Sequence, residues 1–465
     1  EANKRNIKII MDLVINHTSD EHPWFIESKK SKDNPYRDFY IWHPGKNGKE
    51  PNNWESIFGG SAWKYDENTD EYFLHVFSSK QPDLNWENPT VRNELYKMVN
   101  WWLDKGIDGF RVDAISHIKK LPGFPDMPNP ENKKYVPSFD GHMNQDGIQV
   151  FLKELKEKTF ANYDIMTVGE ANGVSIDQAE EWVGEKNGKF DMIFQFEHLD
   201  LWGKNSDNGL DIHALKKTLT KWQKGLEGVG WNALFLENHD QPRSISTWGN
   251  DEEYRVESAK CLATMYFLMQ GTPFIYQGQE IGMSNVQFAS INDYNDVGMR
   301  NYYYNELENG TPVEDIMEVI WKTGRDNSRT PMQWTNEKNA GFTTGTPWMK
   351  VNPNYPEINV EKEIHDPDSV YHYYKKLIQL RKNESVFIYG NYDLIMEEHD
   401  QIYAYTRTWG EEMFLVVTNL FAEQAMFSFP NHLVNKTKKI ILSNYVENDE
   451  KVLKPYEARI YKLVD

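Results

Sequence analysis

Cysteine is almost absent from this sequence, because Cys261 is the single one among 465 residues. One cysteine excludes a disulfide within the chain and a metal site built from several thiolates. Cys261 lies in the apolar stretch 258–269, which predicts a buried helix, so we expect an unreactive core thiol. That stretch is also much shorter than the roughly 20 apolar residues of a membrane-spanning helix. We therefore expect no membrane partner.

Basic residues are outnumbered, with 51 Lys and Arg against 71 Asp and Glu, for a net charge of −20. Such a surplus of negative charge disfavours binding to nucleic acid or to anionic membranes and suits a protein that acts on a neutral substrate. No internal repeat or low-complexity tract is present. At this length the chain can bury a large core, and we expect more than one domain.

Several apolar segments end in polar residues, and helical patterns separate them. Segments of this type are 7–17, 109–113, 165–170 and 232–240, with further apolar strands expected at 192–197 and 273–280. Strands that alternate with helices predict a parallel βα architecture. Polar side chains at the carboxyl ends of parallel barrel strands are typical of catalytic sites.

The segment 109–113 places Arg111 and Asp113 on one face of a strand, because side chains alternate between faces. A guanidinium beside a carboxylate favours its ionised form, which a nucleophilic aspartate requires. Alone, this pattern is more often a structural ion pair. The other acids at strand ends favour the functional interpretation.

Four of these segments carry a family resemblance. Residues 12–17, 109–113, 168–170 and 237–240 resemble the four signature regions of the α-amylase family of glycoside hydrolases. Residues 81–86 resemble a further region of that family, and 324–334 resemble a segment of its oligo-1,6-glucosidase and α-glucosidase branch. The resemblance runs along nearly the whole chain.

The resemblance implies an α/β fold, a (β/α)8 TIM barrel with an inserted small domain and a C-terminal antiparallel β-domain. We expect the catalytic barrel in 1–16 and 87–384, the inserted domain in 17–86 and a β-sandwich in 385–465. Relatives begin with two βα units before the strand at 8–14, so we expect the first two units of the barrel to be missing. We expect no metal or other cofactor among the visible residues, and a structural calcium site in the missing part is left open.

Local patterns predict helices at 91–105, 148–160, 212–225, 254–270 and 368–382. The last of these is expected to begin at Asp366-Pro367, because proline suits the first turn of a helix. Residues 121–140 are expected to form a loop, since Pro, Asn and Gly dominate them. Residues 281–366 are expected to be irregular.

Retaining glycosidases use two carboxyl groups about 5–5.5 Å apart, one as nucleophile and one as acid and then base. The resemblance implies that Asp113 is the nucleophile, Glu170 the acid/base and Asp240 the third acid, which stabilises the transition state. An apolar strand precedes Glu170, and we expect desolvation there to favour the protonated acid.

The resemblance also implies a set of substrate-binding residues. His17 and His239 would donate hydrogen bonds to the sugar, Arg111 would support the nucleophile, and Arg329 would reach the terminal sugar. Glu237 would either line the next subsite or hold its loop. Small residues like Ala114 follow the nucleophile in relatives that prefer α-1,4 bonds, whereas valine stands there in oligo-1,6-glucosidases.

We therefore expect a retaining α-glucosidase that releases terminal glucose from short α-glucosides, with α-1,4 bonds preferred because of Ala114. The alternatives are an oligo-1,6-glucosidase, a sucrose isomerase or transglucosidase, and a catalytically silent sugar-binding relative. The expected partner is a small oligosaccharide and not nucleic acid. We expect the protein to be cytoplasmic and either a monomer or a homodimer.

Overall fold

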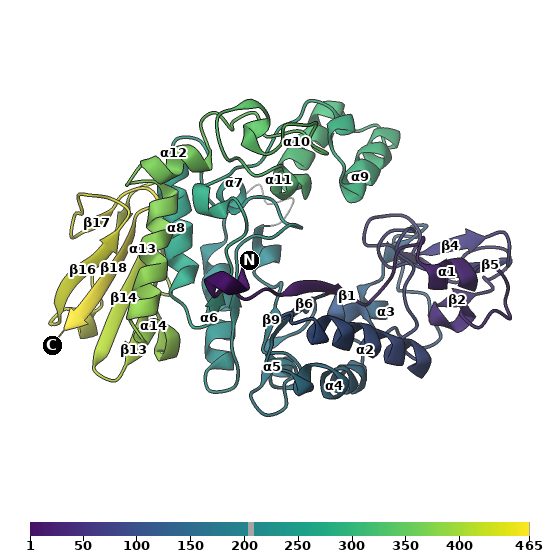
Figure 1. Ribbon diagram of the computed structural model, residues 1–465. Coiled ribbons are helices and arrows are strands. Elements are labelled where there is room, and N and C mark those ends of the chain that lie inside the picture. The colour runs from purple at the N-terminus through teal and green to yellow at the C-terminus, as the bar shows by residue number, and fades with distance from the viewer. Residues whose placement is uncertain (203–208, 465) are drawn as a thin grey trace. The chain divides into compact units, whose positions relative to one another are not determined.

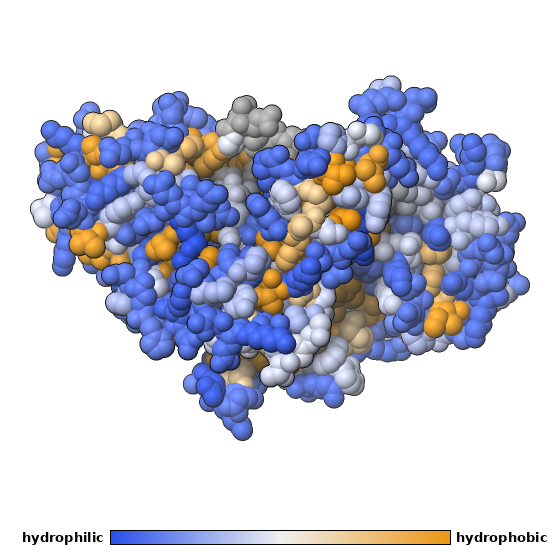
Figure 2. Space-filling model, turned by 90° about the horizontal axis from the view of Figure 1, so that it is seen from above, coloured by the Kyte–Doolittle hydropathy of each residue, from blue (hydrophilic) through white to orange (hydrophobic). Residues whose placement is uncertain are grey.

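The computed structural model describes residues 1–202 and 209–464, which divide into two compact units. The first unit is Glu1–Phe196 with Gly228–Trp231, and the second is Glu197–Glu227 with Asn232–Asp465 (Figure 1). The domain boundaries expected from the sequence stay a prediction. Over the described ranges, no helix is both long and apolar enough to cross a membrane. In the view of Figure 2 hydrophilic residues cover most of the visible surface.

The first unit is built on a parallel sheet with the strand order β1-β6-β8-β9. Its strands are β1 (Met11–Val14), β6 (Gly109–Asp113), β8 (Met166–Glu170) and β9 (Met192–Phe194). Helices α2 (Pro89–Asp104), α4 (Ile148–Lys158) and α5 (Ala179–Val183) connect successive strands and lie along one side of the sheet (Figure 1). The predicted βα alternation is confirmed in this unit.

Helix α2 shows why local sequence predicted its bounds well. The Asn88 side chain accepts a hydrogen bond from the backbone N–H of Thr90, and Pro89 occupies the first turn. Its buried positions Val91, Leu95, Tyr96, Val99 and Leu103 recur at helical spacing. Gly106, at φ 88°, follows its end in the left-handed conformation that glycine adopts readily.

The insertion after β1 contains helix α1 (Pro23–Ser28) and a three-stranded antiparallel sheet of β2 (Trp42–His43), β5 (Glu71–Leu74) and β4 (Trp63–Asp66). Strand β3 (Trp54–Glu55) pairs with β7 (Val136–Pro137), which lies in the expected loop 121–140. Met127 and Val136 share a hydrophobic core with Trp54 and Trp63. The later loop is therefore packed onto the insertion. A short helix α3 (Phe139–His142) follows it.

The second unit combines helices with a C-terminal antiparallel sheet. The sheet has the order β12-β13-β14-β18-β16, and a separate pair β15-β17 accompanies it. Its strands are β12 (Asn391–Ile395), β13 (Ile402–Trp409), β14 (Glu412–Asn419), β15 (Ala425–Met426), β16 (Thr437–Ser443), β17 (Val452–Leu453) and β18 (Ala458–Val464). The predicted antiparallel β-region is confirmed.

Some helices of the second unit share a hydrophobic core with that sheet. They include α6 (Ile212–Leu226), α7 (Ser244–Trp248), α8 (Arg255–Phe267), α13 (Val370–Asn383) and α14 (Val386–Tyr389). Helices α8 and α13 share one hydrophobic core with β13, β14 and β18. Cys261 is fully buried in this core, as expected. The C-terminal sheet is thus joined to its helices by a continuous apolar interior.

Three expectations about this unit were wrong. The strand expected at 273–280 is short: β10 (Ala233–Leu234) pairs with a β11 of only Thr272–Pro273, and a 3-10 helix follows Gly278 at φ 88°. Helix α13 begins after Ser369, whose hydroxyl accepts from the backbone N–H of His372, and not at Asp366-Pro367. Residues 281–366 are not irregular, since they form α9 (Val297–Glu308), α10 (Val313–Thr323), α11 (Asp326–Arg329) and α12 (Val360–His365).

Candidate active site

In the first unit one guanidinium contacts three carboxylates on neighbouring strands of the sheet. Parallel pairing sets Asp12 opposite Arg111, and Val112 opposite Gly169. Arg111 Nη1 donates to Asp12 Oδ1 at 2.8 Å and to Asp113 Oδ1 at 2.7 Å. Its Nη2 donates to Glu170 Oε2 at 2.7 Å. The two predicted catalytic acids of this unit therefore share one cation.

The charge balance of this cluster favours an ionised Arg111. Burial opposes its charged form, but Glu170, Asp113 and Asp12 outweigh burial and raise the pKa of Arg111. Asp12 lies in the segment 12–17, which resembles a family signature region, yet its role as a partner of Arg111 was not predicted. Only the strand register reveals that contact.

Glu170 lies in a more polar setting than its apolar strand suggested. Besides Arg111, the backbone N–H of Ala114 donates to its Oε2 at 3.0 Å. Two donors therefore contact one oxygen of Glu170, and the expected effect of desolvation on its protonation stays a prediction. Ala114 has φ 44° and ψ 33°, a left-handed conformation that aims its N–H at Glu170. The Ala114 side chain is buried, with 5% exposed.

His17 follows β1 and is 7% exposed. Its Nδ1 is 3.2 Å from Asn16 Nδ2, and its Nε2 is 3.0 Å from Gln81 Nε2. Burial is the largest influence on this imidazole and lowers the pKa of His17 below its usual range. Asp83 and Asp113 act in the opposite direction. His17 is accordingly neutral at pH 7.

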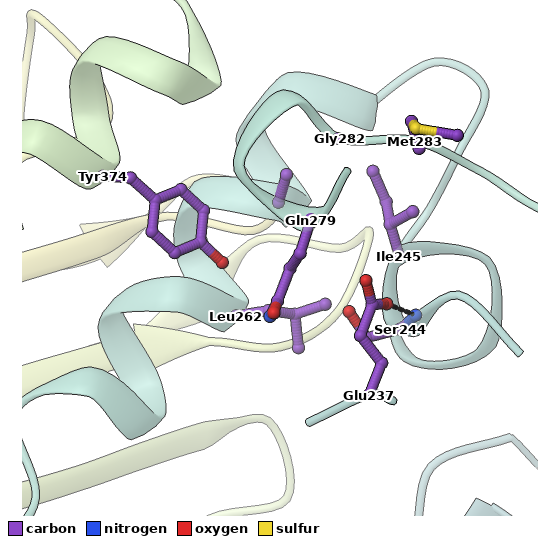
Figure 3. Close-up of a pocket in the computed structure, with 9 residues that line it drawn as sticks. Glu237, Ser244, Ile245, Leu262, Gln279, Gly282, Met283 and Tyr374 are labelled. Carbon is purple, nitrogen blue, oxygen red and sulfur yellow. Dashed lines mark hydrogen bonds between the residues drawn. The ribbon is translucent and has the colours of Figure 1, made fainter. Parts of the chain in front are cut away.

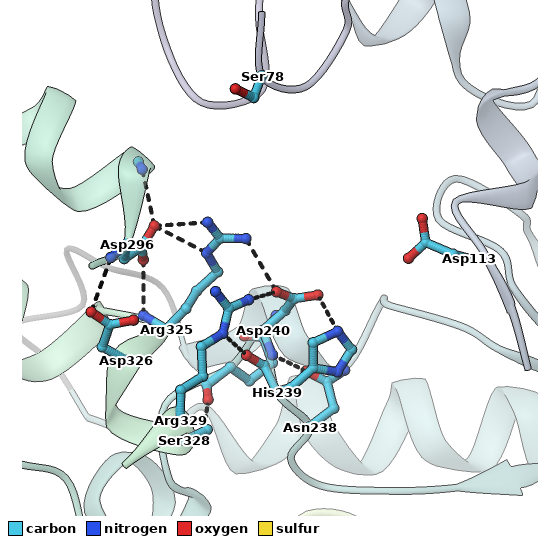
Figure 4. Close-up of polar contacts among 12 residues, drawn as sticks. Ser78, Asp113, Asn238, His239, Asp240, Asp296, Arg325, Asp326, Ser328 and Arg329 are labelled. Atoms are coloured by element: carbon cyan, nitrogen blue, oxygen red, sulfur yellow. Dashed lines mark hydrogen bonds and ion pairs between the residues drawn. The ribbon is translucent and has the colours of Figure 1, made fainter. Parts of the chain in front are cut away.

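In the second unit Asp240 is held by three cationic or donor side chains (Figure 4). Arg325 Nη1 donates to its Oδ1 at 3.1 Å, and Arg329 Nη2 donates to the same oxygen. His239 Nε2 lies 3.1 Å from its Oδ2. Arg325 also pairs with the buried Asp296 at 2.7 Å. Sequence reasoning named His239 and Arg329 but missed Arg325, which is the N-cap residue of the short helix that ends at Arg329.

Glu237 is buried, and its contacts support the loop-holding alternative. Its carboxylate accepts from Arg243 Nη1 at 3.3 Å and from the backbone N–H of Ser244, and the Glu237 and Arg243 side chains are each 1% exposed. Glu237 also lines a small cavity with Gln279 and Tyr374 (Figure 3). Within residues 1–202 and 209–464, no group of three or more His, Cys, Asp or Glu is placed to hold a metal ion.

Comparison with known proteins gives concordant matches. The family model described as "Alpha amylase, catalytic domain" matches residues 1–390. The "Probable oligo-1,6-glucosidase 3" of Bacillus subtilis is 59% identical over 461 residues, which are 98% of this chain and 83% of that protein. The oligo-1,6-glucosidase of Parageobacillus thermoglucosidasius is 56% identical and covers 100% and 84%. A crystal structure of Bacillus licheniformis trehalose-6-phosphate hydrolase superposes with a TM-score of 0.92, at 43% identity, over 100% of this chain and 85% of that one.

Proposed function

This chain belongs to the α-amylase catalytic-domain family of glycoside hydrolases, and from that premise we propose that it is a retaining α-glucosidase acting on short α-glucosides. It has the fold of that family, a TIM barrel with a C-terminal antiparallel β-domain. The observation that carries the proposal is the cluster in which Arg111 contacts both Asp113 and Glu170.

We propose a double displacement at the anomeric carbon that Asp113 and Glu170 carry out in two steps. The carboxylate of Asp113 attacks the anomeric carbon while Glu170 transfers its proton to the departing glycosidic oxygen, which leaves a glucosyl-aspartate ester. Glu170 then removes a proton from water, the water oxygen bonds to the anomeric carbon, and the bond to Asp113 breaks with net retention. Arg111 Nη1 donates to Asp113 Oδ1, and we propose that this contact positions the nucleophile.

The motif in the second unit supports further roles. We propose that Asp240 and His239 bind sugar hydroxyls, because they occupy the corresponding positions of the family motif. Arg325 and Arg329 both donate to Asp240 Oδ1, which leaves its Oδ2 shared with His239 alone among these side chains. We propose that the two arginines orient this carboxylate. Glu237 holds the loop through Arg243.

For the linkage we propose α-1,4, because a small side chain at Ala114 leaves room for the second sugar. Glucose release from maltose and isomaltose by the same preparation tests this directly, and we expect the larger kcat/KM with maltose. The α-1,6 candidate is favoured by the names of two relatives at 59% and 56% identity. A preference for isomaltose would select that candidate and leave the catalytic roles unchanged.

The Ala114→Val variant tests the proposed role of this side chain. One or two methyl groups in a pocket change the discrimination between substrates by about 10- to 200-fold. We therefore expect the ratio of kcat/KM for maltose to kcat/KM for isomaltose to decrease by a factor in that range. Valine at a left-handed φ is strained, and some protein will be lost to misfolding. The ratio of two substrates on one sample cancels that loss. Ala114→Gly relieves the backbone without adding bulk and is the control, and an unchanged ratio in Ala114→Val removes Ala114 from the argument.

A further inference from the structure

Both ring nitrogens of His17 lie against amide NH2 groups. Asn16 Nδ2 is 3.2 Å from Nδ1, and Gln81 Nε2 is 3.0 Å from Nε2. A neutral imidazole carries a proton on one nitrogen and a lone pair on the other, so it can accept only one of these contacts. The other contact brings two N–H donors together. One of the two amides must therefore present its oxygen to His17, and its neighbours decide which.

The Asn16 amide is fixed by two buried charges. Its Oδ1 accepts from Lys120 Nζ at 3.0 Å, and its Nδ2 donates to Asp83 Oδ2 at 3.2 Å. Lys120 and Asp83 pair at 2.6 Å with side chains 4% and 0% exposed. Reversing this amide would set NH2 against an ammonium and a carbonyl oxygen against a carboxylate. Both contacts would be repulsive in a setting where water does not screen them.

The Gln81 amide is fixed by much less. Its Oε1 accepts from the backbone N–H of Ser78 at 3.1 Å, which is a neutral and part-buried contact. Reversing it loses that neutral hydrogen bond, sets the amide NH2 against the Ser78 N–H, and creates a new hydrogen bond from His17. Hydrogen bonds to charged groups contribute more to stability than neutral ones. Gln81 is therefore the amide that reverses and presents its oxygen to His17.

We infer that Asn16, held by Lys120 and Asp83, fixes His17 as the tautomer with its proton on Nε2. Asn16 is thus a positioning residue, since it makes Nε2 of His17 an obligate hydrogen-bond donor. The use of this donor rests on the proposed function: Nε2–H donates to Gln81 in the free protein, and a sugar hydroxyl oxygen that replaces the Gln81 amide oxygen accepts from it. Three charged groups act on this ring, namely Asp83, Asp113 and Lys120, and burial outweighs them to keep it neutral.

The tautomer is measured directly by NMR on the whole chain labelled with 15N-histidine at pH 8. Long-range 1H–15N correlations separate protonated from unprotonated ring nitrogens, and His17→Asn identifies the His17 signals. We expect Nε2 in the protonated range and Nδ1 in the unprotonated range. The reversed pattern, or shifts averaged between the two tautomers, would overturn the inference.

Two variants distinguish the effect of the Asn16 amide on the tautomer from that of the Gln81 amide. In Gln81→Met the neighbour of Nε2 is lost, and we expect the proton to stay on Nε2 because Asn16 is unchanged. In Asn16→Asp a carboxylate accepts from Nδ1, and we expect the proton to move there. A Gln81→Met spectrum with the proton on Nδ1 would show that Gln81, and not Asn16, sets the tautomer of His17. Gln81 is only part-buried, so this variant still decides if Asn16→Asp fails to fold.

Kinetics connect the tautomer to the reaction. In folded Asn16→Asp we expect kcat/KM for a short α-glucoside to fall about tenfold, the effect of one lost hydrogen bond. An Nε2–H signal in a protein that hydrolyses no α-glucoside would refute the proposed function and leave the tautomer standing. An Nδ1–H signal in an active enzyme would refute the inference alone.

Discussion

A buried pair of histidines predicts how the first unit responds to acid. His117 Nδ1 lies 2.9 Å from His142 Nδ1, and His142 Nε2 lies 3.1 Å from Ser138 Oγ. The two rings are 4% and 1% exposed. Burial lowers the pKa of His117 from 6.5 to about 3, and the nearby ammonium of Lys120 acts in the same direction. Burial also lowers the pKa of His142 well below its usual range.

The direction in which stability changes with pH follows from proton binding by the unfolded chain. Between pH 6.5 and about 3 the unfolded His117 is protonated and the folded one is not, so unfolding takes up a proton. Stability from this group is complete above pH 6.5 and falls as the pH drops towards 3. From pH 7.5 to 5.5 the linkage relation gives a loss of about 1.4 kcal/mol from His117 alone.

The assay compares denaturant unfolding at these two pH values for the wild type, for His117→Gln and for a control, His432→Gln, at an exposed imidazole. We expect the wild type and the control to lose about 1.4 kcal/mol more between pH 7.5 and 5.5 than His117→Gln does. An equal pH dependence in all three proteins would refute the buried neutral pair. NMR signals of His117 or His142 that titrate near pH 6 would refute it independently.

Three further predictions concern the catalytic acids and the buried ion pair. Asp113→Ala should abolish turnover with the fold intact, and retained activity would remove it as nucleophile. Glu170→Gln should slow maltose hydrolysis by about 10²–10⁴-fold and slow an aryl glucoside less, because a good leaving group needs less acid assistance; equal losses would count against its acid role. Glu237→Gln leaves Arg243 buried without a counter-charge, so we expect a loss of about 3–5 kcal/mol in unfolding free energy with KM unchanged, whereas a changed KM in a stable variant would restore the subsite role.

Local patterns were sufficient for many elements of the fold. Helix α2 is specified by a cap at Asn88, a proline in its first turn, a regular apolar stripe and Gly106 after its end. The same kind of pattern failed between 281 and 366. Helix α9 buries none of its residues, and it is held by the apolar cluster it shares with α10. A helix stabilised mainly by its neighbour has little periodic signal of its own.

The sequence by itself determined the family and which residues we propose as catalytic, because Asp113, Glu170 and Asp240 stand in motifs that can be recognised without coordinates. Tertiary structure decided their partners. Strand register brings Glu170 to Arg111, although 59 residues separate them, and this gives Glu170 a polar setting that its own strand did not suggest. Motif and periodicity are short-range properties of the chain, whereas hydrogen bonds and charge pairing depend on distances that only the folded backbone sets.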